Sequence, residues 1–196
     1  ADEERAEAVS EEAREQREEI AEDRREMLGE PEEEAAEQQP LPLLFMKVRY
    51  ADGEPVGQPV VIDRRTGDEI RRSDIDAVTS RSFDRLDGDA LVVADYEGLS
   101  RLLLIDEENL EPVATGEDRV YAQSSILVRG RNEIYAVVEV DNGWRLGRFD
   151  GSLELEAYSS ELVEPATYIE IVEETIYVQN RTGTVIDLSI EELQED

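Results

Sequence analysis

The sequence predicts an all-β fold, a propeller-like repeat of about four antiparallel blades, preceded by an N-terminal charged α-helix. A short apolar run ending in aspartate recurs along the chain. The four aspartates lie 43, 44 and 37 positions apart and are Asp63, Asp106, Asp150 and Asp187. A fixed spacing that carries β-type runs is typical of blade-like or stacked β repeats. In addition, the composition changes from helix-forming to β-forming at Leu43, and turn residues separate the runs that follow.

Residues 1–40 are predicted to form a charged helix and linker. Residues 2–28 are rich in Glu, Arg and Ala without Gly or Pro, and Gly29 and Pro31 then supply a stop signal. One stripe recurs every seven residues, at Ala6, Ala13, Ile20 and Met27. The positions between these are too polar for a firm coiled coil, so we expect a solvated helix with weak self-association. The alternative is the end of a longer coiled region, because the chain starts at Ala1 and is expected to be a mature form or a fragment.

Residues 41–196 are predicted to form the β-repeat domain. Its first unit is expected to consist of strands 44–50, 59–63 and 69–72, with a turn at 51–55. The second unit has the full set of strands, which we expect at 82–86, 90–94, 101–106 and 112–114. Asp87-Gly88 favours a hairpin turn, because this pair tolerates the positive φ angles of a type I′ turn. Pro112 suits an edge strand, since proline cannot donate to a ladder.

The third and fourth units follow the same plan. The third is expected to have strands 120–128, 134–140, 144–150 and 153–157, with Asn142-Gly143 as its hairpin signal. The last is expected to have strands 167–171, 175–178 and 183–187, and then a short C-terminal helix opened by a capping box at 189–192. The first unit lacks its first strand and the last lacks its fourth. Pairing the two ends of the chain would complete a ring without open edges. The alternatives are an open arc of blades and a β-sandwich.

Composition excludes several classes of function. The chain has 51 acidic and 20 basic residues and a net charge of -31, so it lacks the cations that nucleic-acid binding needs. Docking on an anionic membrane is disfavoured for the same reason. The acidity fits solubility or a high-salt setting, or else a docking surface for a basic partner. No apolar run is long enough to insert directly into a bilayer. The absence of Cys and His removes thiolate chemistry and the commonest general base.

No catalytic, cofactor-binding or metal-ligating residue is assigned from the sequence. The four repeated aspartates are interpreted as turn-forming residues, since Asp at a strand end accepts hydrogen bonds from the following N–H groups. Asp84, Asp87 and Asp89 form an acidic cluster that lacks EF-hand spacing. Most of the aromatic residues in the strands are expected to pack in the core, namely Tyr121, Tyr135, Trp144, Tyr168 and Tyr177.

Four segments of the β region carry a family resemblance. They are residues 44–50 (LFMKVRY), 80–83 (SRSF), 134–138 (IYAVV) and 146–150 (LGRFD). On these segments, residues 41–188 resemble the C-terminal region of the spirochaetal, Borrelia-type 83/100 kDa antigen family. The Glu-rich lead-in resembles that family's charged helical middle region. The resemblance implies a periplasmic or cell-envelope protein, and it supplies no catalytic residue.

The leading hypothesis is a non-enzymatic binding or scaffolding module, with a propeller-like head on a helical stalk and a protein partner. No cofactor is expected. The second hypothesis is a carboxylate-based hydrolase or metal-dependent enzyme acting on one face of the ring. Because 51 acidic residues make some carboxylate pair inevitable, the sequence marks no particular pair for this function. The third is a structural spacer that assembles through the N-terminal helix.

Overall fold

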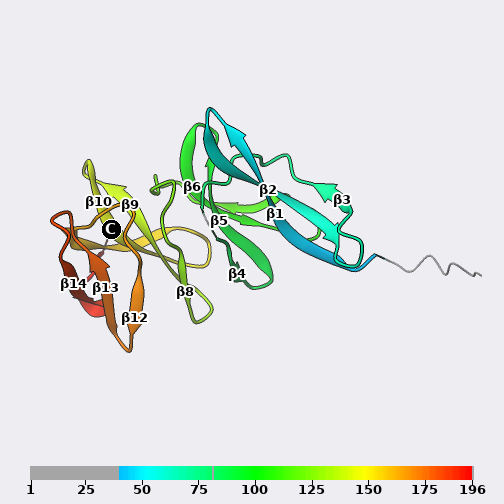
Figure 1. Ribbon diagram of the computed structural model, residues 1–196. Helices are drawn as coiled ribbons and strands as arrows, with labels where there is room; N and C mark the ends of the chain where they lie inside the picture. The colour runs from blue at the N-terminus through cyan, green and yellow to red at the C-terminus, as the bar shows by residue number, and fades with distance from the viewer. Residues whose placement is uncertain (1–39, 81, 196) are drawn as a thin grey trace, which may run out of the picture. The chain divides into compact units, whose positions relative to one another are not determined.

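The computed structural model describes residues 40–80 and 82–195 (Figure 1). Leu41–Asp196 forms one compact unit. The regular structure in the described residues is all-β apart from a single 3-10 turn, and it forms four antiparallel sheets. The charged helix predicted for the N-terminal region lies outside the described residues. The all-β prediction is therefore confirmed for the part of the chain that carries the repeats.

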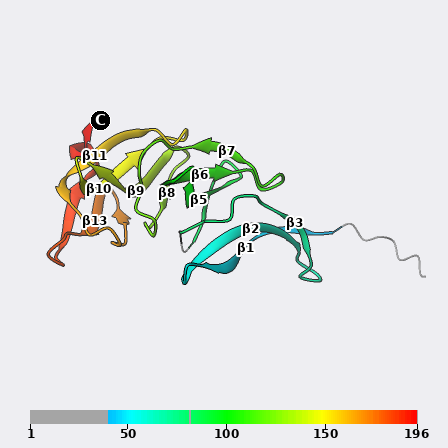
Figure 2. The ribbon, with the colours of Figure 1, turned by 90° about the horizontal axis from the view of Figure 1, so that it is seen from above.

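The four sheets follow one another along the chain. The first contains β1 (Pro42–Ala51), β2 (Glu54–Asp63) and β3 (Glu69–Arg72). The second contains β4 (Asp84–Leu86), β5 (Asp89–Tyr96), β6 (Leu99–Ile105) and β7 (Pro112–Thr115). The third contains β8 (Leu127–Arg129), β9 (Glu133–Val140), β10 (Gly143–Phe149), β11 (Leu155–Leu162) and the C-terminal β15 (Gln194–Glu195). The fourth contains β12 (Glu170–Val172), β13 (Thr175–Gln179) and β14 (Val185–Ser189). Figure 2 shows the consecutive strands β5, β6 and β7 next to one another in the second sheet.

Two-residue turns in which both residues have positive φ join β1 to β2, β4 to β5, β5 to β6 and β9 to β10. Leu86 pairs with Asp89, so Asp87 and Gly88 occupy the turn as predicted, with φ of 51° and 101°. The β9–β10 turn differs from the prediction by one residue. Val140 pairs with Gly143, and the central residues are Asp141 and Asn142, with φ of 52° and 58°. Asp and Asn both tolerate this left-handed conformation, so either pair in Asp-Asn-Gly suits such a turn.

Three further expectations need correction. The strand predicted at 120–128 is only β8 plus an isolated bridge at Val120, because a turn separates the two. The predicted C-terminal helix is a 3-10 turn at Ile190–Glu192, and Ser189 makes no capping side-chain hydrogen bond. The ends of the chain do not pair: β15 pairs with β11, and within the described residues β1 pairs with β2 alone.

Three apolar clusters fill the spaces between consecutive sheets. Alternate residues of one strand enter different clusters, because successive side chains point to opposite faces of a sheet. On β5, Leu91 and Val93 pack toward the third sheet, whereas Ala90 and Val92 pack toward the first. On β9, Ile134, Ala136 and Val138 contact the second sheet, and Tyr135 and Val137 contact the fourth. The two middle sheets are therefore covered on both faces, and the first and last sheets on one.

A repeated backbone bridge, which we call the inter-sheet seam, joins each sheet to the next. It is centred on a buried valine: Val78, Val120 and Val163. Each valine donates its N–H to a carbonyl of the preceding sheet, at Gly57, Ser100 and Trp144, over 2.9 Å in all three cases. Each also bridges to the second strand of its own sheet or to the residue just after it, at Ala94, Val138 and Asn180. The repeat seen in the sequence is therefore present in the hydrogen bonding between sheets.

A hydroxyl group follows each of these valines. The Oγ of Ser80 accepts the N–H of Val93 over 3.1 Å, and the Oγ of Ser124 accepts that of Val137 over 2.8 Å. In the fourth sheet the same function falls to Thr167, whose Oγ1 accepts the N–H of Gln179 over 2.7 Å. These hydroxyls satisfy backbone donors where no strand is available, and an unpaired buried N–H would be costly.

Candidate functional site

Three of the four repeated aspartates form turns and are not gathered into a site. The Oδ1 of Asp63 accepts the N–H of Arg65 over 2.9 Å. The Oδ1 of Asp106 accepts the N–H groups of Glu108 and Asn109, both over 2.7 Å. The Oδ1 of Asp150 accepts the N–H groups of Ser152 and Glu154 over 2.9 and 3.0 Å. The interpretation of these residues as turn formers is confirmed.

The fourth copy is not Asp187. This residue lies within β14, opposite Tyr177. The equivalent turn is formed by Asn180, whose Oδ1 accepts the N–H groups of Thr182 and Thr184, both over 3.0 Å. Asn180 follows β13, the second strand of its sheet. Asp106 and Asp150 follow the third strand of their sheets, and Asp63 ends β2, the second strand of the first sheet. An amide oxygen accepts the same bonds as a carboxylate, so the turn does not require aspartate.

Hydrogen bonding also sets the charge state of these aspartates. The N–H groups of Asn109 and Glu108 hold the pKa of Asp106 below its usual value, and the N–H of Arg65 does the same for the pKa of Asp63. Partial burial works against the charged form of Asp150, but hydrogen bonds from Glu154 and Ser152 outweigh it and lower its pKa. These three groups stay ionised, which suits hydrogen-bond acceptors and not general acids.

The acidic cluster at the start of the second sheet includes one perturbed carboxyl. Burial raises the pKa of Asp89, and the charges of Asp106, Glu107 and Asp87 raise it further. Asp84 instead accepts the N–H of Arg85. Within residues 40–80 and 82–195, no group of three or more Asp or Glu side chains is placed to hold a metal ion.

The aromatic residues divide into a packed set and an exposed set. Tyr135 is buried and donates its hydroxyl to Glu133 over 3.2 Å, and burial with the Glu133 charge raises its pKa to about 12. Tyr121 and Trp144 pack edge to face with ring centroids 5.5 Å apart, beside the same cluster. Tyr168 and Tyr177 are exposed. The expectation that most of these aromatic residues pack in the core holds for Tyr135, Tyr121 and Trp144.

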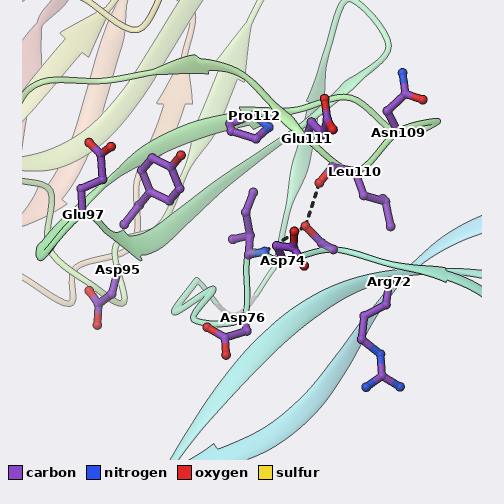
Figure 3. Close-up of a pocket in the computed structure, with 12 residues that line it drawn as sticks. Arg72, Asp74, Asp76, Asp95, Glu97, Asn109, Leu110, Glu111 and Pro112 are labelled. Carbon is purple, nitrogen blue, oxygen red and sulfur yellow. Dashed lines mark hydrogen bonds between the residues drawn. The ribbon is translucent and has the colours of Figure 1, made fainter.

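One hollow in the described part of the chain lies where the first sheet leads into the second. It has a volume of about 700 Å³ and is drawn in Figure 3. Five carboxylate residues line it: Asp74, Asp76, Asp95, Glu97 and Glu111. Its one cation is Arg72, which bonds Glu69 over 2.7 Å and in Figure 3 points away from the other labelled side chains. Two arginines outside the lining partly offset this charge, because Arg49 pairs with Asp76 and Arg101 lies 3.9 Å from Glu97. The hollow remains acidic, since five carboxylates line it.

We call this hollow the acidic hollow. A buried serine, Ser73, fixes one of its walls. The N–H of Ser73 donates to the carbonyl of Pro59, and its hydroxyl donates to the carbonyl of Leu110 over 2.7 Å. The same hydroxyl accepts the N–H of Ile75 over 3.1 Å. Ile75 and Leu110 are buried in the cluster between the first and second sheets. Asp74, Asp76 and Glu111, which flank these residues, thus project from a wall that is anchored in the core.

The acidic hollow was not predicted from the sequence. Its carboxylates come from three separate segments, 74–76, 95–97 and 111, and nothing in their spacing marks them among so many acidic residues. The seam was also missed, although its valines lie 42 and 43 positions apart and its hydroxyls 44 and 43. The regular spacing is present in the sequence, but it involves single valines and hydroxyl residues that lie outside the apolar runs.

Comparison with known protein families shows to which family the chain belongs. The model of the Borrelia P83/100 protein family matches residues 1–169. The chain belongs to this family. The resemblance read from the β segments is therefore confirmed, and it extends through the N-terminal region. Membership of this antigen family suggests a surface or envelope protein. No helix in the described part of the chain is both long and apolar enough to cross a membrane.

A search of curated proteins returns no match. Solved structures similar to the chain include the computationally designed protein Ika4, at 13% identity and a TM-score of 0.48, covering 74% of this chain and 91% of Ika4. The designed protein Ika8 has 15% identity and a TM-score of 0.49, covering 80% of this chain and 49% of Ika8. BamB from Moraxella catarrhalis has 11% identity and a TM-score of 0.49, covering 78% of this chain and 52% of BamB. The chain thus spans about half of the last two, and no function follows from these likenesses.

Proposed function

We propose that the chain is a non-enzymatic binding or scaffolding module of a cell-envelope protein, and that the acidic hollow receives a basic segment of a protein partner. The observation that carries the proposal is the gathering of five carboxylates around a hollow whose lining cation, Arg72, is bonded to Glu69. Asp76 pairs with Arg49 and Glu97 lies 3.9 Å from Arg101, so the carboxylates still outnumber the cations around the hollow. Charges of one sign around a concave surface attract the opposite sign and speed the encounter of the two molecules.

We also propose that the four sheets are arranged as propeller-like blades. The seam supports this arrangement, because the same backbone bridge joins each sheet to the next at Val78, Val120 and Val163. Repeats that are joined by one recurring interface are related by a nearly constant rotation and translation. Such a rotation generates either a ring or an open arc. Either arrangement gives a rigid head that presents loops to a partner.

The proposed location is the periplasm or the cell envelope, in line with the antigen family. Residues 1–40 carry 17 acidic and 5 basic residues and are proposed to act as a charged helical stalk. Weak self-association through this helix is part of the proposal. The β domain is proposed to make the contact with the partner.

A carboxylate-based hydrolase or metal-dependent enzyme is the second candidate function. It is favoured by the same hollow, since two carboxylates of a cleft can act as an acid–base pair. Within the described residues no group of three carboxylates is placed to hold a metal ion. A general acid needs a raised pKa. Burial and neighbouring charges raise the pKa of Asp89, but Asp89 does not line the hollow. The binding function therefore has the stronger support.

The test uses the full chain immobilised and exposed to a cell-envelope extract of its source organism. A triple variant, Asp74→Asn with Glu97→Gln and Glu111→Gln, removes three exposed charges from the hollow. A control variant removes three exposed charges elsewhere, through Glu117→Gln, Glu161→Gln and Glu191→Gln. Net charge is identical in the two variants, so a difference in capture reports the hollow alone.

The proposal predicts a captured protein that is lost with the hollow variant, retained with the control and released by salt. Equal capture by both variants, or no capture at any salt concentration, would contradict it. Calcium and magnesium titrations of the same three proteins by calorimetry address the second candidate. Heat that disappears only in the hollow variant would support a metal-dependent enzyme.

A further inference from the structure

Exposed apolar side chains concentrate in the two end sheets. In the described strands, the large apolar side chains that remain exposed include five in the first sheet and three in the last: Leu43, Phe45, Val48, Tyr50 and Ile70, and Val172, Tyr177 and Val185. The two middle sheets contribute Val113 alone to this set. Repeat proteins normally cover their terminal units with polar residues. Apolar end sheets therefore indicate surfaces that meet another protein.

The outer face of the first sheet combines apolar and basic side chains. Leu43 pairs with Ile62 and Phe45 with Val60, so these four side chains lie on one face, opposite to that of the buried Leu44. On this face Leu43 and Phe45 of β1 are exposed, whereas Val60 of the central strand is buried. Lys47 continues this face, and Phe45 is 50% exposed. The strands β1–β3 contain four basic and three acidic residues, in a chain whose net charge is -31. We call the outward Leu43, Phe45 and Lys47 the head patch.

The outer face of the last sheet combines apolar and acidic side chains. Tyr177 pairs with Glu170 on one side and with Asp187 on the other, so the three share a face. Val172 and Val185 lie on the same face, and Val185 is 67% exposed. The inward face is buried against the third sheet. The strands β12–β14 contain two acidic residues and no basic ones. We call these five outward residues the tail patch.

We propose that the head patch of one copy packs against the tail patch of a second copy of this chain. The two patches match in chemistry, because each has an apolar centre. On the head side, Lys47 and Arg72 both pair with Glu69, which leaves one net positive charge to meet the acidic flank of the tail patch. The proposed contact is also of the type found within the chain, where each middle sheet packs face to face with a sheet on either side. A second copy supplies the neighbour that each end sheet lacks.

The contact joins two different surfaces, so it is heterologous. A heterologous contact closes into a ring when the rotation between copies allows it and otherwise grows into an open chain. This arrangement is separate from self-association through the N-terminal helix, because it depends on residues of the β domain. It is also independent of the acidic hollow, whose triple variant leaves both patches unchanged.

Analytical ultracentrifugation of the full chain tests the proposal. The buffer holds about 0.15 M salt, where the Debye length is about 8 Å and the repulsion between acidic copies is largely screened. Phe45→Glu breaks the head patch and Tyr177→Glu breaks the tail patch. Val113→Glu is the matched control, since it adds the same charge at an exposed apolar residue of a middle sheet. Circular dichroism checks that each variant is folded, and Lys47→Glu with Val185→Glu provides a second pair.

The wild type is expected to exceed the monomer mass of 22.2 kDa as concentration rises, and Val113→Glu is expected to behave in the same way. Each patch variant is expected to raise the dissociation constant by at least about tenfold, the size of effect common at the centre of an interface. An equimolar mixture of Phe45→Glu and Tyr177→Glu should associate again. The first variant keeps an intact tail patch and the second keeps an intact head patch. A monomeric wild type, association unaffected by either variant, or a mixture that stays monomeric would overturn the proposal.

Discussion

The middle and end sheets of this chain use similar strands in different environments. In the second and third sheets, β5 and β9 are buried along most of their length on both faces. In the first and last sheets, β1 is mostly exposed and β13 alternates between buried and exposed residues. The difference lies in the number of neighbours, because the seam and the apolar clusters cover an end sheet on one side only. The repeat therefore stabilises its centre more than its ends.

The largest expected effect comes from truncating a matched leucine in each region. Leu102→Ala removes a fully buried side chain of the second sheet and should cost about 2–5 kcal/mol of unfolding free energy. Leu43→Ala removes an exposed side chain of the first sheet and should stay within about 0.5 kcal/mol. Urea unfolding at low protein concentration, where copies do not associate, measures both. Equal costs would show that the ends are as well packed as the centre.

The hydroxyls that follow the seam valines should also contribute differently to stability at the centre and at the end of the repeat. Ser124→Ala removes a buried hydroxyl and leaves the N–H of Val137 unpaired, for an expected cost of about 1–3 kcal/mol. Ser80→Ala removes the equivalent hydroxyl at the first seam. The serine there is only partly buried, so water can replace the lost acceptor and the cost should be smaller. Thermal unfolding of the two variants compares them, and a larger loss for Ser80→Ala would reverse the expected order.

The turn formers predict a pH effect of smaller size. The pKa of Asp106 is lowered in the folded state, so its contribution to stability is present above the unfolded pKa of about 3.9 and is lost as pH falls through the folded pKa. In Asp106→Asn the same bonds are accepted by an uncharged amide, as at Asn180. Wild type should therefore lose stability relative to this variant below about pH 4. The reverse substitution, Asn180→Asp, should introduce a similar loss of stability at low pH. If the unfolding free energies of wild type and both variants change in parallel from pH 3 to 6, this linkage is excluded.

The smallest expected effect concerns the ion pairs on the first sheet. Hydrogen bonds from Arg72 and Lys47 lower the pKa of Glu69 to about 2. Lys47→Met should raise that pKa, because one of the two cations is removed while Arg72 stays in place. The global stability should barely change, since exposed ion pairs contribute little. An NMR titration of the Glu69 carboxyl checks the direction, and an unchanged pKa would show that Arg72 alone holds the charge.

The strands could be read from the sequence because their signals are local. Apolar runs such as 102–105 and turn pairs such as Asp87-Gly88 each specify a structure within a few residues, and both lie where they were expected. The turn at Asp141-Asn142 was placed one residue too far along. Adjacent Asp, Asn and Gly all accept positive φ, and only the register of the strands selects between them.

The seam and the acidic hollow could not be read in this way, because both depend on contacts between distant segments. Val120 is a bridge between Ser100 and Val138, and the local sequence shows only a valine in a polar stretch. Asp187 resembled a fourth turn former by spacing, yet it lies inside β14, and Asn180 takes that function. Position in a sheet, and not the residue alone, decides whether an aspartate forms a turn.

Hydrogen exchange of the amides of Val78, Val120 and Val163 tests most directly the claim that one repeated seam joins four equivalent sheets. All three donate over 2.9 Å to the preceding sheet and are buried. We predict that all three exchange slowly, with Val120 slowest because it lies between the two middle sheets. Rapid exchange at any of the three, with slow exchange in the strands on either side of it, would contradict the account.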